Sequence, residues 1–500
     1  MSEFKSTLDK KYIFLFLILF ILLNYPRLLT HPYNLEWVFI ELSKYFNDNT
    51  YYFNIDRYKI WQANPTFYSL IISVLNKINF FFSDYFLPRF LNLIGVSYCA
   101  AKFFYSKFLD YKIKTVIVIS LLINPIFTVF IFRVYPDILS LVLFYLSIIF
   151  FYEKKYIFIF ICLLLSVFLK PVAILYSPIF ILSLFYLYYQ KLSEFYFKEF
   201  IYILFTPVVV IILYILFVRY FEISLFSEKV GLSYLKFSFY NSVTNFFRYF
   251  IYIFLISFPF LIFPFYSIYK KTIHSKKYYL FLISLIFSLL IVFTFNINSN
   301  YGELSYGFLD ALINLNPLLI QFFIVFNFCF FLTFSFITLS IKQNKFLILS
   351  IFFILILSLF IFRPAQRYVM YIYPFFLLYI FSNYEINFTK ILNIFLSLFL
   401  IILFFSVSII QFNIQKKKIS IFEDAILFIN NNDLSSKIYP EILLGSHGDY
   451  FEIYLKNVKD TEFSDGFDYQ VISNNCDQRN IYFKSYKFFL YQYEICIIKN

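Results

Sequence analysis

Residues 132–171 read FRVYPDILSLVLFYLSIIFFYEKKYIFIFICLLLSVFLKP, two apolar runs on either side of a short charged segment, EKK. The runs cover about 138–152 and 156–170, close to the roughly 17–25 apolar residues that a transmembrane helix needs. The three charged residues leave room only for a tight connection. This stretch therefore predicts two antiparallel membrane helices joined on one side of a bilayer.

The same pattern extends along the chain of 500 residues, which is 61% hydrophobic and only 14% charged. Soluble domains carry about 25% charged residues, so we predict a polytopic α-helical membrane protein. Apolar runs of sufficient length predict about thirteen transmembrane helices. The expected spans are 12–30, 86–106, 115–132, 138–152, 156–170, 172–189, 200–218, 248–268, 278–296, 317–341, 346–362, 368–383 and 391–411.

The distribution of charge predicts the orientation of the chain. The tail, 412–500, has 10 Lys and Arg against 12 Asp and Glu, a net charge of −2, so residues 1–411 carry +15, mostly in short loops, which gives the chain its net +13. Lys-containing connections mark the cytoplasmic side, which places the N-terminus inside; an odd number of spans places the tail outside. The basic residues are thus topology signals and argue against a nucleic-acid partner. We expect an integral protein of the bilayer, in a bacterial inner (plasma) membrane.

Two segments outside the bilayer are long enough to fold. The first loop, 31–85, belongs to the membrane domain 1–411, and we predict amphipathic interfacial helices at 34–46 and from Asn64-Pro65 onward. The tail is predicted to be a small extracytoplasmic α/β domain. Its helix starts at a capping box, Ser420 to Glu423, and its strands are EILLG, FEIYL, YQVIS and YKFFLYQYEICII. Cys476 and Cys496 in this tail form either a disulfide or two separate thiols.

An acidic residue close to the first span is a candidate for chemistry. Glu36 lies beside Asn34 and Trp37, and Glu41 follows on the same predicted helix. A carboxylate at this depth could take the proton of an attacking hydroxyl group. With Asn34 as the helix cap, Glu36 is equally a favourable negative charge in the first helical turn. The residues alone leave both interpretations open.

Further candidates lie at the predicted outer ends of spans. Arg133 and Asp137 flank Pro136 in a short turn, and Lys170 precedes Pro171 between two apolar runs. Arg363 and Arg367 are four residues apart in RPAQRY. Cations at headgroup depth can hold a lipid phosphate, whereas the alternative for each Arg is interfacial anchoring.

The sequence also contains weaker signals. Glu303 and Tyr306 in NYGELSYGFLD could line a sugar site, as polar loop residues often do. The cysteines lack metal-ligand spacing, and neither a nucleotide-binding glycine loop nor an HExxH motif is present. ATP-driven transport and zinc proteolysis therefore lose support.

These parts together resemble the GT-C class of membrane glycosyltransferases, which includes protein O-mannosyltransferases and lipid A aminoarabinose transferases. The resemblance is carried by one span before a long outside loop with an early acid (YNLEWVFIELSKYF), a proline-led helix (ANPTFYSLI), the RVYPD turn, the RPAQRYVMYIYP segment and an outside α/β tail. Family members often have Asp-Glu or Asp where this chain has Asn34-Leu35-Glu36. That departure leaves both Glu36 and Glu41 as candidates for the base.

The resemblance implies an inverting transfer of a sugar from a polyprenyl-phosphate donor to an acceptor hydroxyl group of a lipid, glycan or protein. Glu36 would be the base, and Asp137 would be a second acid near the acceptor or a metal. Lys170, Arg133, Arg363 and Arg367 would hold the donor phosphate. The resemblance also implies that no cofactor is required and that any dependence on a divalent cation is weak.

Three other functions compete with this expectation. A surface-polysaccharide polymerase or O-antigen-ligase-like protein usually has its main outside loop late in the chain, whereas here it is the first. A transporter or flippase should bury charges within spans and repeat its halves, and no internal repeat is visible. The third is a non-catalytic membrane scaffold that has kept the fold without the base.

Overall fold

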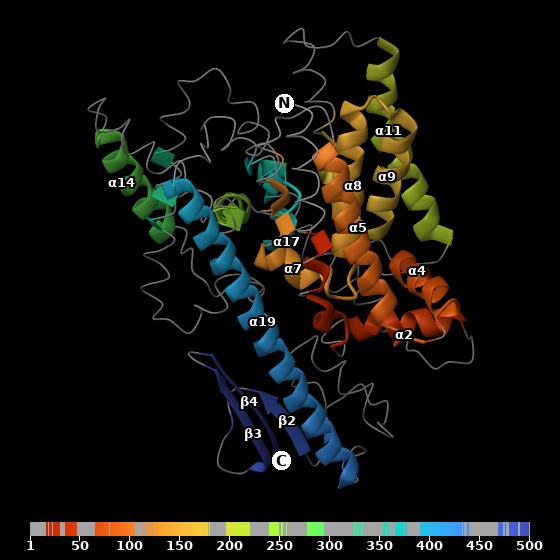
Figure 1. Cartoon of the computed structure of the whole chain (residues 1–500), viewed down its shortest axis with the longest axis vertical. Coiled ribbons are helices and arrows are strands. Elements are labelled where there is room, and N and C mark those ends of the chain that lie inside the picture. Colours follow the sequence, from red (N-terminus) through yellow and green to blue (C-terminus); the bar gives the residue numbers. More distant parts are fainter. Residues whose placement is uncertain are drawn as a thin grey trace.

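The residues that the computed structural model describes are 17–30, 36–47, 66–105, 114–180, 197–220, 240–257, 278–294, 325–333, 354–359, 366–377, 391–439 and 469–499, with short gaps inside several of these ranges. Over these residues the protein is mostly helical and has one small β-sheet. Figure 1 shows the sheet at the lower end of the molecule, beside one long helix that extends from the helical body.

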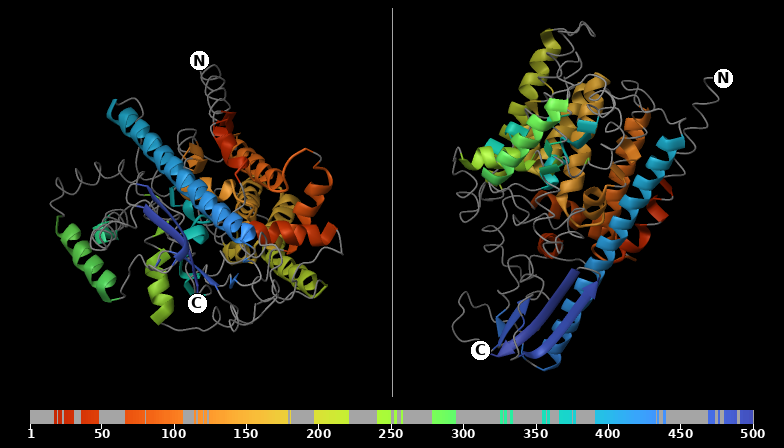
Figure 2. Two further views of the ribbon diagram at one scale, coloured as in Figure 1. Left: turned by 90° about the horizontal axis from the view of Figure 1, so that it is seen from below. Right: turned by 90° about the vertical axis from the view of Figure 1, so that its left-hand side faces the viewer.

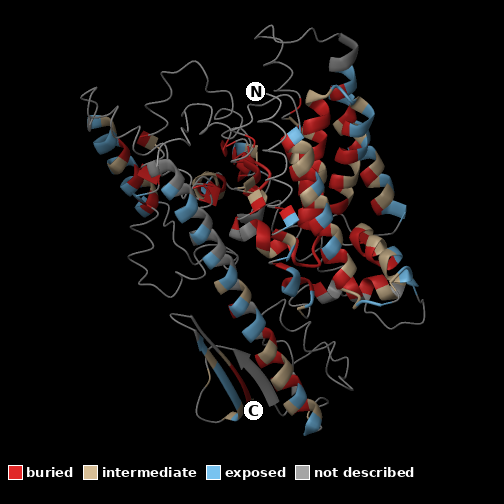
Figure 3. Ribbon diagram, viewed as in Figure 1, coloured by how far each residue is buried: buried red, intermediate tan, exposed pale blue. Residues whose placement is uncertain are grey.

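The predicted helical hairpin lies at the centre of the body. α8 (Pro136–Tyr152) and α9 (Tyr156–Leu169) pack along each other, α5 (Phe86–Tyr105) packs against α8, and α11 (Phe197–Tyr220) packs against α9. Pro136 opens α8, a position where its missing N–H group costs no hydrogen bond. Figure 3 shows α8 buried along almost its whole length. The two packed helices predicted within residues 132–171 are thus confirmed.

Both predicted helices of the first loop are present. α2 (Glu36–Asn47) and α4 (Thr66–Lys77) pack against each other across the end of the body where α8 begins and α9 ends, as Figure 1 shows. The Phe39 and Tyr68 rings meet edge to face, with centroids 5.5 Å apart. Ser73 also donates a hydrogen bond of 2.6 Å to the Asn47 side chain. The two helices therefore form a layer over one end of the bundle.

Apolar side chains cover the outside of several helices. Of the described helices, only Ile201–Tyr220 of α11 is both long and apolar enough to cross a bilayer, and 28% of its most apolar stretch is buried inside the protein. A core helix of a soluble protein would be mostly buried. Pro136–Tyr152, Tyr156–Leu169 and Tyr279–Thr294 are apolar but shorter. Much of the predicted set of thirteen spans lies outside the described residues.

The tail contains a four-stranded sheet with the order β1-β2-β4-β3. β1 (Ile438–Tyr439) pairs in parallel with β2 (Tyr469–Ser473), while β4 (Tyr491–Lys499) pairs antiparallel with β2 and β3 (Asn480–Phe488). YQVIS is β2, as predicted, and the run YKFFLYQYEICII is divided between β3 and β4. The predicted strands EILLG and FEIYL lie outside the described residues. Cys476 and Cys496 form a disulfide, the first of the two alternatives.

The expected capping box at Ser420 is wrong, because one uninterrupted helix passes from the last apolar run into the tail. α19 (Ile391–Asn431) has 41 residues and includes both the predicted span 391–411 and the tail helix. Ser420 lies inside it and donates a hydrogen bond of 3.1 Å to the Lys417 carbonyl oxygen. The predicted domain boundary at 411–412 therefore falls within a helix. Figure 2 shows the sheet alongside its C-terminal half, where Phe428 packs on Tyr482.

Candidate functional site

A buried ion pair joins the start of α2 to the start of α5. Glu36, the first residue of α2, is completely buried, and Arg89 in the first turn of α5 is 1% exposed. Arg89 Nη2 donates a hydrogen bond of 2.7 Å to Glu36 Oε2. Charges leave water at a high cost that is offset only when they are paired and hydrogen-bonded. The two residues therefore fix the position of α2 on the bundle.

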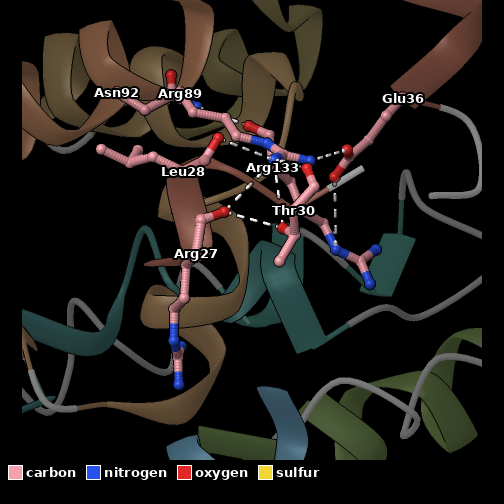
Figure 4. A network of polar contacts seen from close by, with 7 residues as sticks. All are labelled: Arg27, Leu28, Thr30, Glu36, Arg89, Asn92 and Arg133. Carbon is pink, nitrogen blue, oxygen red and sulfur yellow. Dashed lines mark hydrogen bonds and ion pairs between the residues drawn. The ribbon is translucent and has the colours of Figure 1, made fainter. Parts of the chain in front are cut away.

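The same guanidinium group also closes the end of the helix that precedes α2, whose last helical residue is Leu28. Arg89 Nη1 donates hydrogen bonds of 3.3 Å to the carbonyl oxygens of Arg27 and Leu28, and contacts the carbonyl and hydroxyl oxygens of Thr30. Carbonyls in the last helical turn lack partners within the helix and form its negative end. Figure 4 shows Arg89 between these oxygens and the Glu36 carboxylate. One side chain thus ties together three segments.

A second arginine approaches the same carboxylate from the turn between α7 (Pro125–Ile131) and α8. Arg133 Nε lies 4.0 Å from Glu36 Oε1, and its guanidinium group lies over the Tyr135 ring. The backbone of this turn is held by Asn92 in α5, whose Nδ2 donates a hydrogen bond of 2.8 Å to the Arg133 carbonyl oxygen. Glu36 therefore lies between two guanidinium groups, as Figure 4 shows.

A second ion pair closes the open end of the α8–α9 hairpin. Asp137 in the first turn of α8 pairs with Lys170, which ends α9, and their side chains are only 9% and 14% exposed. Lys170 Nζ also lies 5.2 Å from the centre of the Tyr368 ring. The backbone of Lys170 is extended and leads directly into the 3₁₀ helix η1 (Pro171–Tyr176). The two apolar runs beside Lys170 are thus separated by a break in the helix.

Tyr68 of α4 connects the two ion pairs. Burial raises the pKa of its phenol, and the carboxylates of Glu36 and Asp137 raise this pKa further, whereas a hydrogen bond with Asn92 and the charge of Arg89 lower it. The Tyr68 hydroxyl group is therefore within electrostatic reach of both acids. The Glu36–Arg89 and Asp137–Lys170 pairs belong to one polar region beneath α2 and α4.

Hydroxyl groups hold the segment after RPAQRY against this region. Tyr176 of η1 donates a hydrogen bond of 2.7 Å to the Tyr368 carbonyl oxygen, and Tyr145 of α8 donates one to the Met370 carbonyl oxygen. The hydroxyl groups of Tyr371 and Ser140 lie 2.7 Å apart. The chain around α17 (Gln366–Val369) therefore lies beside Lys170, more than 190 residues away in the sequence.

The structure brings four of the predicted site residues together from separate segments, namely Glu36, Arg133, Asp137 and Lys170. Trp37 and Glu41 are helical residues of α2, and Arg367 is one of α17, but their side chains lie outside the described part of the structure. Asn34, Glu303, Tyr306 and Arg363 lie outside it entirely. The catalytic and phosphate-binding roles of all these residues remain predictions.

Sequence reasoning missed Arg89, Tyr68 and Asn92. Arg89 carried a usable signal, because an ionisable residue inside an apolar span is rare and usually has a specific partner. Asn92 is three residues later and so lies on the same helical face. Tyr68 carried no signal of its own, since it is one of 47 tyrosines.

The described residues contain no group of three His, Cys, Asp or Glu side chains that could hold a metal ion. Comparisons of the chain with protein-family models, with curated proteins and with solved structures find no match.

Proposed function

We propose that this protein is a GT-C-like membrane glycosyltransferase, which moves a sugar from a polyprenyl-phosphate donor to an acceptor hydroxyl group on the extracytoplasmic face. One observation carries the proposal. Two carboxylates and two cations from three separate segments, Glu36, Arg133, Asp137 and Lys170, meet at one end of an apolar helical bundle. A carboxylate can accept the proton of an attacking hydroxyl group, and cations can stabilise the negative charge that develops on a leaving phosphate.

The proposed setting is a bilayer crossed by about thirteen helices, with the site at the outer leaflet. Apolar side chains on the outside of α11 and α14 (Tyr278–Thr294) support contact with lipid, since exposed apolar surface of this extent is costly in water. The site, the layer of α2 and α4, and the tail sheet lie toward the same end of the molecule in Figure 1. Their common position supports placing the site and the tail on the same side of the bilayer. In the proposed orientation that side is extracytoplasmic, and the N-terminus is in the cytoplasm.

In the proposed reaction, the acceptor oxygen attacks the anomeric carbon of the sugar. The bond from that carbon to the phosphate oxygen breaks, and its electron pair leaves with the polyprenyl phosphate. The acceptor proton passes to the Glu36 carboxylate, which Arg89 orients. Lys170 and Arg133, together with Arg363 and Arg367, neutralise the phosphate as its charge develops. Because Glu36 is buried, the substrate reaches it only when α2 or its neighbours move aside.

The proposal is tested in cells that lack the protein and are complemented with the wild type, Asp137→Asn or Glu36→Gln. We expect mass spectrometry of envelope glycans and lipids to show one sugar-bearing product that wild-type protein restores and both variants lose. The amount of folded protein is measured by size-exclusion chromatography in detergent and used to normalise each result. A product profile that is identical with and without the protein would overturn the proposal.

A second measurement separates transfer from transport. Purified protein in detergent micelles has no two compartments, so a flippase loses its function there while a transferase keeps it. We expect the micellar protein to transfer sugar from a polyprenyl-phosphate-sugar extract of the same cells. A lipid-pyrophosphate fraction serves as the control, because a polysaccharide polymerase or ligase would use that donor instead.

A further inference from the structure

The turn between α8 and α9 lies at the end of the helical body opposite to α2 and α4, as Figure 1 shows. Glu153 caps the end of α8, and its Oε1 lies 2.9 Å from Lys102 Nζ in the last turn of α5. Its Oε2 lies 2.8 Å from Lys155 Nζ, at the start of α9. Together with Lys154 these residues form a lysine cluster, whose three positive charges and one negative charge give a net charge of +2.

An aromatic ring helps to hold the two paired ammonium groups in place. Lys102 Nζ lies 5.7 Å and Lys155 Nζ lies 5.9 Å from the centre of the Phe150 ring, close enough for cation–π attraction. Both side chains still reach the surface, since Lys102 is 26% and Lys155 is 48% exposed. An ammonium group has three N–H donors, so each lysine can bind an anion while it remains paired with Glu153.

Exposed apolar side chains lie directly beside the lysine cluster. Tyr98 and Tyr105 of α5 are exposed, and they are four and three residues from Lys102, which places them on its helical face. Ile157 and Phe158 in the first turn of α9 are exposed as well. A soluble anion would contact only the charges, whereas a phospholipid would contact the charges with its headgroup and the apolar side chains with its acyl chains.

We infer that the lysine cluster binds the phosphate of an anionic phospholipid, whose acyl chains lie on the apolar side chains of α5 and α9. A phosphate carries the opposite charge and accepts charge-assisted hydrogen bonds from ammonium groups. Basic pockets between membrane helices on the cytoplasmic side bind such headgroups, and this turn is cytoplasmic in the proposed orientation. The lipid site does not depend on the proposed sugar transfer, because it lies at the other end of the body.

Lysines that act only as topology signals make a different prediction. Such a signal orients the chain during insertion, so the folded protein would respond equally to lipids of any headgroup charge. The experiment therefore adds phosphatidylglycerol to the purified protein in detergent and measures the thermal midpoint by size-exclusion chromatography. Phosphatidylcholine with the same acyl chains is the comparison lipid, since its headgroup has no net charge. We expect phosphatidylglycerol to raise the midpoint much more than phosphatidylcholine does.

Substitutions within the lysine cluster should change this response in opposite directions. Lys102→Gln combined with Lys155→Gln should raise the concentration of phosphatidylglycerol needed for half of the rise by about tenfold or more. Glu153→Gln should lower that concentration, because it removes the negative charge next to the lipid phosphate. Each midpoint is compared with that of the same variant without lipid. Native mass spectrometry, which counts retained phosphatidylglycerol molecules, should show fewer on the double variant than on the wild type.

Lys44→Gln combined with Lys484→Gln is the matched control. It also removes two lysines that form ion pairs, with Asp84 and Asp424, and changes the net charge of the chain equally. This control should respond to phosphatidylglycerol as the wild type does, and an equal loss in both double variants would assign the effect to net charge and overturn the lipid site. An equal rise with both lipids, or an unchanged response of the Lys102 and Lys155 double variant, would overturn it too. A rise of the same size with inorganic phosphate would show that no lipid is recognised.

Discussion

Glu36 and Arg89 lie in the first turns of two different helices, and their side chains meet at 2.7 Å with almost no exposure to solvent. The contact is asymmetric. Arg89 also bonds to the carbonyl oxygens of Arg27 and Leu28 at the end of the helix before α2, whereas Glu36 has Arg133 at 4.0 Å as its second cation. Glu36 thus holds α2 in place as well as being the proposed base, and the two roles have to be separated by measurement.

The first prediction uses this asymmetry. Arg89→Gln should destabilise the protein by about 3–5 kcal/mol, because it leaves a buried carboxylate and several carbonyl groups without their donor. Glu36→Gln should cost less, since Arg89 keeps its carbonyl acceptors. Thermal unfolding in detergent measures both variants. Equal losses would show that the carbonyl contacts contribute little to the stability.

The second prediction concerns Lys170 and the donor phosphate. Lys170→Gln removes one charge-assisted contact, so we expect the KM for a polyprenyl-phosphate sugar to rise about tenfold or more, with a smaller change in the acceptor KM. Arg363→Ala should act in the same direction. Equal effects on both substrates would remove the residue concerned from the donor site. Lys484→Gln in the tail is the control, as it breaks a surface ion pair with Asp424.

The four converging charges could be predicted because charged residues at the ends of apolar runs are few. Arg133, Asp137 and Lys170 each stand at such an end, and a carboxylate or an ammonium group is costly in lipid unless it is paired. Their partners could not be predicted in the same way. Arg89 bonds to backbone carbonyl groups about sixty residues earlier in the chain. Every residue has such a group, so the sequence does not show which ones accept a hydrogen bond from a distant side chain.

The continuity of α19 was missed for a different reason. QKKK at 415–418 and Ser420 with Glu423 both resemble a boundary, the first as an interfacial charge run and the second as a cap. Neither Gly nor Pro occurs between Ile391 and Asn431, so nothing in the chain forces the helix to end. The sheet then covers its apolar face, including Phe422 and Ile429. Tertiary burial extended the helix beyond the local signals.

The third prediction concerns the turn between α8 and α9. Lys154 has a φ of 57°, and its backbone N–H bonds to the Phe151 carbonyl oxygen while that of Lys155 bonds to Phe150, which closes α8 with a left-handed residue. Glycine adopts this conformation without strain. Lys154→Gly should therefore stabilise the protein by about 1 kcal/mol. Lys154→Ala is the control, since it removes the charge and keeps the strain; an equal gain in thermal midpoint would point to charge instead.

The fourth prediction is a pH dependence at the same turn. Burial alone would raise the pKa of Glu153, but hydrogen bonds and charge from Lys155 and Lys102 lower it below its ordinary value of 4.5. A lowered pKa in the folded state adds stability that is complete above pH 4.5 and is lost as the pH falls through the folded value. The loss should be about 0.2–1 kcal/mol, since the groups are partly exposed. Glu153→Gln should lack this contribution to the stability already at neutral pH. On acidification, the thermal midpoint of this variant should therefore fall less than that of the wild type.

The fifth prediction tests the compartment of the tail through the Cys476–Cys496 disulfide. Disulfides persist in oxidising compartments and are rare in the cytosol. Protein taken directly from cells, denatured and treated with a maleimide-linked polymer should therefore gain mass only at Cys99, Cys162 and Cys329. Reduction before labelling should add two more polymers. A variant with the three free cysteines replaced by alanine gives the cleanest comparison, with no label before reduction and two after it. Two labels without reductant would place the tail in a reducing compartment and reverse the proposed orientation of the chain.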